Sequence, residues 1–92
     1  MKKQAPRPPL PSRYDVFLEL QQSIIDLAAV YEETGNEKIL RALGIQKKLL
    51  AIFESEEMVF RQEELDEAYR KIGLLPHAVR TWLLHYRDEE LQ

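Results

Sequence analysis

Glycine and proline are distributed unevenly along this chain, and their distribution limits the folds that it can adopt. Four of the five prolines fall within residues 6–11. After residue 13, the glycines and prolines are Gly35, Gly44, Gly73 and Pro76. Because these two residue types most disfavour a helix interior, their scarcity favours long helices. We therefore expect a disordered, basic, proline-rich tail in residues 1–13, followed by one helical domain in residues 14–92.

Apolar residues in the expected domain recur every three or four positions, which is the spacing of one side of an α-helix. The first predicted helix starts near Tyr14, with Ser12 or Asp15 as its cap. Its apolar stripe comprises Tyr14, Phe17, Leu18, Ile24, Ile25, Ala28 and Tyr31. Thr34-Gly35-Asn36 predicts a stop and a restart, since glycine suits the end of a helix and asparagine its beginning. So short a link makes the next helix, over residues 37–53, an antiparallel neighbour.

The rest of the chain predicts two shorter helices. One covers residues 61–71 and ends at Gly73, and the other runs from Pro76, in its first turn, to Asp88. Gly44 is expected to permit close helix packing within the second helix. No alternating pattern of useful length indicates a strand. The predicted fold class is all-α: a small four-helix domain in which an antiparallel hairpin precedes a C-terminal helix-turn-helix-like pair.

Charge is segregated along the chain, although the net charge is only −3. Residues 14–67 contain thirteen acids and five bases, whereas residues 68–87 contain four bases and no acid. The acidic middle disfavours nonspecific binding along nucleic acid, but a local basic surface near the C-terminus is compatible with DNA contact.

Residues 65–84 carry the strongest functional pattern: the small Ala68, the apolar-glycine-apolar turn Ile72-Gly73-Leu74, then Val79 and Trp82 three positions apart. In spacing, this segment resembles the helix-turn-helix superfamily of DNA-binding domains. The resemblance implies two short helices that cross steeply, with the second entering the major groove. Tyr69 is expected to lie against the second helix. The same pattern also fits two ordinary core helices, so both interpretations stay open.

The resemblance also implies a set of DNA contacts. His77, Arg80 and Thr81 would be exposed near the start of the second helix, together with Ala78. Arg80 suits guanine O6 and N7, and Thr81 suits a phosphate or a thymine methyl group. Arg70, Lys71 and Arg87 would reach phosphates. The candidate DNA-binding residues are therefore Arg70, Lys71, His77, Arg80, Thr81 and Arg87.

The alternative function is a protein-interaction module, such as an adaptor, assembly chaperone or inhibitor, that binds a partner through its helical hairpin. Its acidic middle would then dock on a basic partner. Additional apolar strips in the hairpin, at residues 16/20/27/30 and 40/45/52, favour a homodimer. The proline-rich tail also matches a pattern of SH3 ligands, but short matches are frequent by chance, and a solvated tail is the simpler interpretation.

Enzymatic signals are weak in this sequence. There is no cysteine, so thiolate metal sites and disulfides are excluded. His77 and His85 lie eight positions apart without a carboxylate between them, and no glycine-rich phosphate loop is present. No apolar run approaches the roughly 20 residues that span a bilayer. We expect a non-enzymatic cytoplasmic protein that holds no cofactor or metal and no membrane segment.

Overall fold

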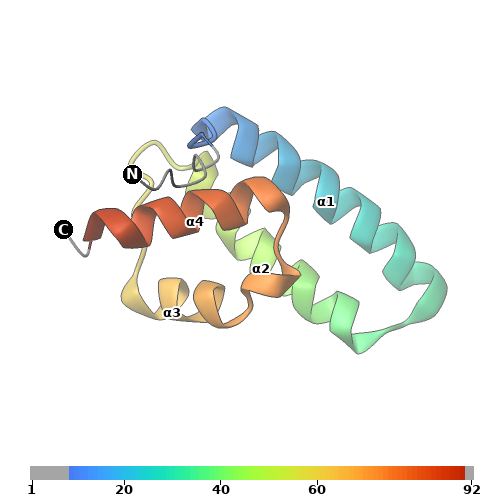
Figure 1. The fold of residues 1–92 in the computed structure, drawn as a ribbon. Helices are drawn as coiled ribbons and strands as arrows, with labels where there is room; N and C mark the ends of the chain where they lie inside the picture. The colour runs from blue at the N-terminus through green and yellow to red at the C-terminus, as the bar shows by residue number, and fades with distance from the viewer. Residues whose placement is uncertain (1–8, 91–92) are drawn as a thin grey trace, which may run out of the picture.

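The computed structural model describes residues 9–90, with side chains as far as residue 87. Within this range the fold is all-α, as predicted, and has no strand (Figure 1). Its elements are α1 (Arg13–Thr34), α2 (Glu37–Glu54), α3 (Gln62–Arg70), the short 3₁₀-helix η1 (Ile72–Leu74) and α4 (His77–Glu90). The predicted tail falls mostly on residues 1–8, outside the described residues; residues 9–12 have no regular secondary structure.

Local capping interactions determine where the hairpin helices begin and end. Ser12 accepts a hydrogen bond from the Asp15 amide at 3.0 Å, and the Asp15 carboxylate accepts one from the Ser12 amide, so α1 starts with a capping box. Gly35 has a left-handed φ of 63°, and its amide donates to the Tyr31 carbonyl. Asn36 accepts a bond from the Lys38 amide and caps α2. The predicted antiparallel hairpin is thereby confirmed.

Helix α2 lies at the centre of the core. It contributes seven buried residues, whereas the longer α1 contributes only Val16 and Leu20. The buried residues of α2 are Ala42, Leu43, Ile45, Gln46, Leu49, Ile52 and Phe53. No residue between positions 21 and 41 is buried. The hairpin therefore has a base, to which the C-terminal helices add cover, and a tip that extends beyond α3 and α4 (Figure 1).

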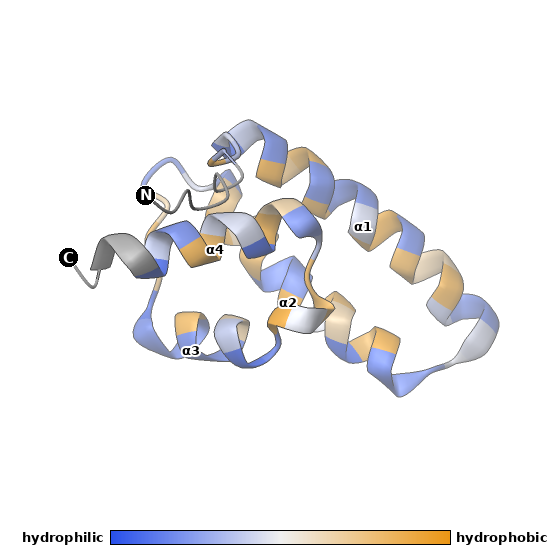
Figure 2. Ribbon diagram, in the orientation of Figure 1, coloured by the Kyte–Doolittle hydropathy of each residue, from blue (hydrophilic) through white to orange (hydrophobic). Residues whose placement is uncertain are grey.

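The predicted core side of α1 is partly wrong. Tyr14 and Ile25 belong to the predicted stripe, yet their exposed fractions are 67% and 63%. Val16 and Leu20, which were assigned to an additional strip, have no exposed surface. Hydrophobic and hydrophilic positions alternate along α1 without forming a single continuous stripe (Figure 2). Periodicity alone could not choose between two overlapping strips, and packing against the other helices decides the matter.

The close-packing role predicted for Gly44 is also wrong. Gly44 is exposed, and a Cβ atom added there would meet nothing within 4 Å, so it does not bring helices close together. Gly73 does not have a positive φ, and a Cβ atom added there would also meet nothing within 4 Å. The turn between α3 and α4 lies where it is predicted, at Ile72–Leu74, and is formed by η1. In it the Leu74 amide donates a hydrogen bond to the Lys71 carbonyl at 2.8 Å. Pro76 lies one residue before α4, where its carbonyl accepts a bond from the Arg80 amide.

Candidate functional site

The C-terminal pair of helices forms part of the core. Leu65 and Ala68 of α3 are buried in the same cluster as Val79 and Leu83 of α4. The Tyr69 hydroxyl donates a hydrogen bond to the Leu83 carbonyl at 2.6 Å, so this side chain lies against the second helix, as predicted. The two short helices thus contribute to one core and are joined by this hydrogen bond.

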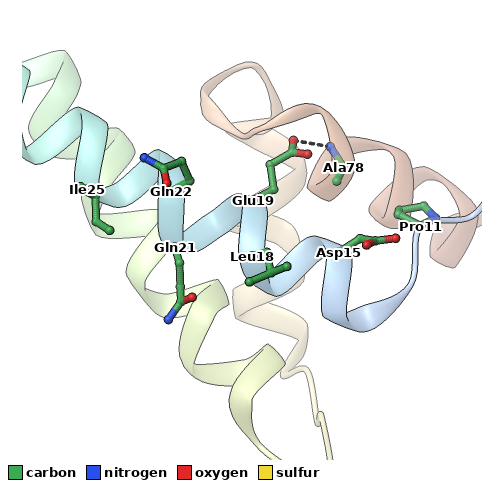
Figure 3. Close-up of a pocket in the computed structure, with 8 residues that line it drawn as sticks. All are labelled: Pro11, Asp15, Leu18, Glu19, Gln21, Gln22, Ile25 and Ala78. Carbon is green, nitrogen blue, oxygen red and sulfur yellow. Dashed lines mark hydrogen bonds between the residues drawn. The ribbon is translucent and has the colours of Figure 1, made fainter.

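The start of α4 is covered by α1. The Ala78 amide donates a hydrogen bond to Glu19 Oε1 at 2.8 Å, and Figure 3 shows the Glu19 side chain extending to that backbone nitrogen. Ala78 and Thr81 retain only 7% and 8% of their exposure. The prediction that they are exposed for DNA contact is therefore wrong, because α1 packs on this side of α4. A carboxylate already occupies the helix N-terminus, where a phosphate would otherwise be favoured.

One of the candidate basic residues is engaged by an acid. Lys71 Nζ lies 3.6 Å from Glu67 Oε2, and Lys48 Nζ lies 3.1 Å from Glu67 Oε1. The hydrogen bond from Lys48 is the main reason why the pKa of Glu67 lies below its ordinary value, and the charge of Lys71 adds to the effect. Lys71 is therefore paired with an acid at the surface of the protein.

The remaining candidates do not form one continuous cationic surface. Arg70 lies beside Glu63 and Asp66, around the same shallow depression. Arg87 places its guanidinium 5.8 Å from the centre of the Tyr69 ring. Arg80 and His77 are exposed on α4. The seven-residue spacing of Arg80 and Arg87 puts them on one side of that helix, so these two arginines share a surface. Arg70 lies apart from them, among acids.

The outer side of α1 carries an unexpected row of exposed apolar side chains. Tyr14, Leu18 and Ile25 have exposed fractions of 67%, 42% and 63%. Their spacing of four and seven residues places them along one side of the helix. We call these three residues the outer stripe. Single exposed apolar residues are common on protein surfaces, but an aligned set along one helix is typical of a contact surface.

A groove of about 690 Å³, open to solvent, runs beside the outer stripe toward the start of α4 (Figure 3). The groove combines aliphatic side chains with amides and carboxylates. Its lining residues are Pro11, Asp15, Leu18, Glu19, Gln21, Gln22, Ile25 and Ala78. The Asp15 carboxylate accepts a hydrogen bond from the Ser12 amide, and the Glu19 carboxylate accepts one from the Ala78 amide, so backbone groups hold both in place. The groove therefore combines apolar side chains with two carboxylates of fixed position.

The two helices of the hairpin carry opposite charge. Helix α1 contains five acids and a single base, Arg13. The Arg13 side chain donates hydrogen bonds to the carbonyls of Phe53, at 2.9 Å, and Ser55. Helix α2 contains two acids and four bases, and all four basic residues are exposed: Lys38, Arg41, Lys47 and Lys48. Within the acidic middle that the sequence indicates, α1 is therefore acidic and α2 is basic, and the other acids follow α2.

Among the described residues, no three side chains of histidine, cysteine, aspartate or glutamate are arranged to hold a metal ion. No helix in the described range is long and apolar enough to span a bilayer. Comparison with protein families, with curated proteins and with solved structures found no match to this chain.

Proposed function

We propose that this protein is an interaction module that binds another protein through the outer side of α1. The observation that carries the proposal is the outer stripe of Tyr14, Leu18 and Ile25 beside an open groove. Removing such an apolar surface from water favours binding, because the burial lowers the free energy of the complex. Amphipathic partners commonly bind to grooves of this kind.

DNA binding through α4 is the less favoured proposal. It keeps His77, Arg80 and Arg87 as exposed residues. Thr81, however, is buried, and Lys71 and Lys48 both form ion pairs with Glu67. Glu19 places negative charge at the start of the helix that would enter the major groove. Because nonspecific affinity for DNA comes mainly from phosphate contacts, these losses weaken the basis of the proposal.

Homodimer formation loses part of the surface on which it was predicted, whereas Val30 and Leu40 of the same strips are exposed, at 41% and 48%. Val16 and Leu20 of one apolar strip, and Ile45 and Ile52 of the other, are buried within the single chain. The packing of α3 and α4 with the base of the hairpin explains their burial. The outer stripe is a different surface, and its own charge bears on which partner it fits.

Site-specific photo-crosslinking would test the proposal directly. A photoreactive amino acid is placed at Ile25 in the native cells, and at Val59 as the control. Val59 is equally exposed, at 62%, but lies between α2 and α3. We expect an adduct with a specific protein from position 25 that position 59 does not give. Identical adducts from both positions would contradict the proposal.

The crosslinked protein is then purified and its affinity for the full chain is measured. Ile25→Ser should weaken binding about 10- to 100-fold, because burying such a side chain contributes roughly 1.5–3 kcal/mol. Val59→Ser should leave the dissociation constant unchanged. Equal affinities for wild type and Ile25→Ser would reject the outer stripe as the contact surface.

The DNA alternative has its own measurement. Fluorescence anisotropy with random duplex DNA at about 50 to 200 mM salt reports phosphate contacts as a steep, log-linear loss of affinity. We expect no such binding. Salt-sensitive binding that Arg80→Ala weakens would favour the helix-turn-helix proposal instead.

A further inference from the structure

From the shape and charge of the hairpin, we infer that the partner presents a cationic amphipathic helix. Its apolar side covers the outer stripe, and its lysine or arginine side chains face the acidic row of α1, which we define as Asp15, Asp26 and Glu33. This inference rests on the proposed function and specifies the partner for the same surface.

The geometry of the outer stripe fits a helix. From Tyr14 to Ile25 the stripe follows the helix axis for about 16 Å, or roughly three turns, at 1.5 Å per residue. Six of the eight residues that line the groove belong to α1, from Asp15 to Ile25, so the groove lies along the same helix (Figure 3). A peptide that binds by strand addition would require the edge of a sheet, and the described residues form none. A second helix packed along α1 places its own apolar side chains between those of the stripe.

The negative charge beside the outer stripe determines the sign of the charge that the partner carries. Asp15, Asp26 and Glu33 are spaced by eleven and seven residues, so they form a row along one edge of the stripe. All three side chains are exposed. The single base of α1 is Arg13, and its guanidinium is bound to backbone carbonyls of α2 and the following loop. Exposed ion pairs add little affinity individually, but a row of them selects the partner and its orientation.

A second copy of this chain does not fit the same surface. A symmetric dimer uses the same patch on both subunits, so two acidic rows would meet. Docking α1 of one copy on the basic α2 of another would satisfy the charges. However, Leu40 is the only large apolar side chain of α2 that is well exposed, at 48%. Such a contact would also be open-ended and would not close into a dimer. The partner is therefore a different chain.

Two members of the acidic row can be changed without removing a helix cap. Asp15 belongs to the capping box of α1, so its loss would also affect the helix. Asp26 accepts a hydrogen bond only from the exposed Gln22 side chain among the bonds seen, at 3.0 Å, and Glu33 is fully exposed near the end of α1. Asp26→Asn with Glu33→Gln is therefore a test of charge that preserves size and shape.

The experiment is a selection from a display library of helical peptides. Each peptide has a fixed apolar seam of three or more turns, and its flanking positions are drawn equally from lysine, arginine, glutamate, aspartate, glutamine and serine. The full chain serves as bait. We expect the selected peptides to be enriched in lysine and arginine, and their affinity to fall as salt is raised.

Matched variants locate the selected peptide. The double variant Asp26→Asn/Glu33→Gln should weaken its binding about three- to tenfold, as expected for two exposed ion pairs. The control Glu56→Gln/Glu57→Gln removes the same charge from the exposed loop after α2, and should change affinity by less than about twofold. Ile25→Ser should weaken the peptide further, whereas Val59→Ser should not.

Three results would overturn the inference. These are selection of neutral or acidic flanks, equal weakening by both double variants, and the absence of any helical binder. Each is distinguishable from failure of the proposed function, which is read from crosslinking at position 25. A crosslinked partner together with neutral peptides would keep the outer stripe as an interaction surface and discard the cationic helix.

Discussion

The base and the tip of the hairpin are built from the same two helices, but they differ in what covers them. In the base, Val16, Leu20 and Leu49 have no exposed surface, and Phe53 retains 2%. In the tip, residues 21–41, every residue is at least partly exposed. Both regions have helix-forming sequences and proper caps. The comparison teaches that local sequence is sufficient to place these helices, whereas their burial depends on the packing of α3 and α4.

An aromatic cluster reinforces the base. Phe53 lies edge-to-face on Trp82, with ring centres 5.0 Å apart, and Phe60 lies 5.7 Å from Phe53. Trp82 stacks on Tyr86 at 5.2 Å. These contacts join α2, the following loop and α4, which are distant in sequence. The tip, residues 21–41, contains none of these aromatic contacts.

The largest expected effect comes from removing a large side chain in each region. Phe53→Ala should lower the free energy of unfolding by about 3–5 kcal/mol, since it empties a buried, well-packed site. Ile39→Ala in the tip should cost clearly less, because Ile39 is only half-buried and the cavity opens to water. Chemical denaturation monitored by circular dichroism measures both. Equal losses would show that the tip is as tightly packed as the base.

Removing the contact between α1 and the start of α4 should have a smaller effect. Glu19→Ala leaves the Ala78 amide without its acceptor, and we expect a loss of about 1–3 kcal/mol for a hydrogen bond to a charged group. Glu32→Ala, on the exposed surface of the tip, is the control and should change stability by less than about 0.5 kcal/mol. Similar values for both variants would mean that Glu19 does not hold α4 to the base.

Two glycine substitutions give the smallest effects and should have opposite signs. Gly44→Ala should stabilise the protein by up to about 1 kcal/mol, because Gly44 is exposed within α2 and a methyl group has room. Gly35→Ala should destabilise it by about 1–2 kcal/mol, because φ is 63° at the turn of the tip. Thermal unfolding separates the two by the direction of the change in Tm. A loss of stability in Gly44→Ala would restore the packing role predicted for this glycine.

The sequence predicted those features that depend on neighbouring residues. Ser12, Gly35 and Asn36 act through backbone groups at most four positions away, and their roles as caps are confirmed. Helix boundaries followed from the same signals. For α3, residues 61–71 were predicted and Gln62–Arg70 is observed, a difference of one residue at each end.

Features that depend on distant residues could not be predicted in this way. Glu19 and Ala78 are 59 positions apart, and nothing near either residue indicates that they meet. The burial of Thr81 and the exposure of Ile25 both follow from how α1 lies on the other helices. The prediction chose the wrong side of α1 as the core side. The predicted site was therefore also wrong, because α4 is covered and cannot present Thr81.

Arg13 gives the hairpin a mechanical property. Its guanidinium binds carbonyls at the end of α2 and just beyond it, at the opposite end of the hairpin from the covalent link Gly35-Asn36. The two helices are therefore connected at both ends, by the covalent link at one end and by the Arg13 hydrogen bonds at the other. A force that pulls on the chain before α1 acts first on the Arg13 hydrogen bonds, and both must break before the first turn can peel away from Val16 and Leu20. Arg13 is thus a latch, and it opposes unzipping of the hairpin from the end at which the chain enters the fold.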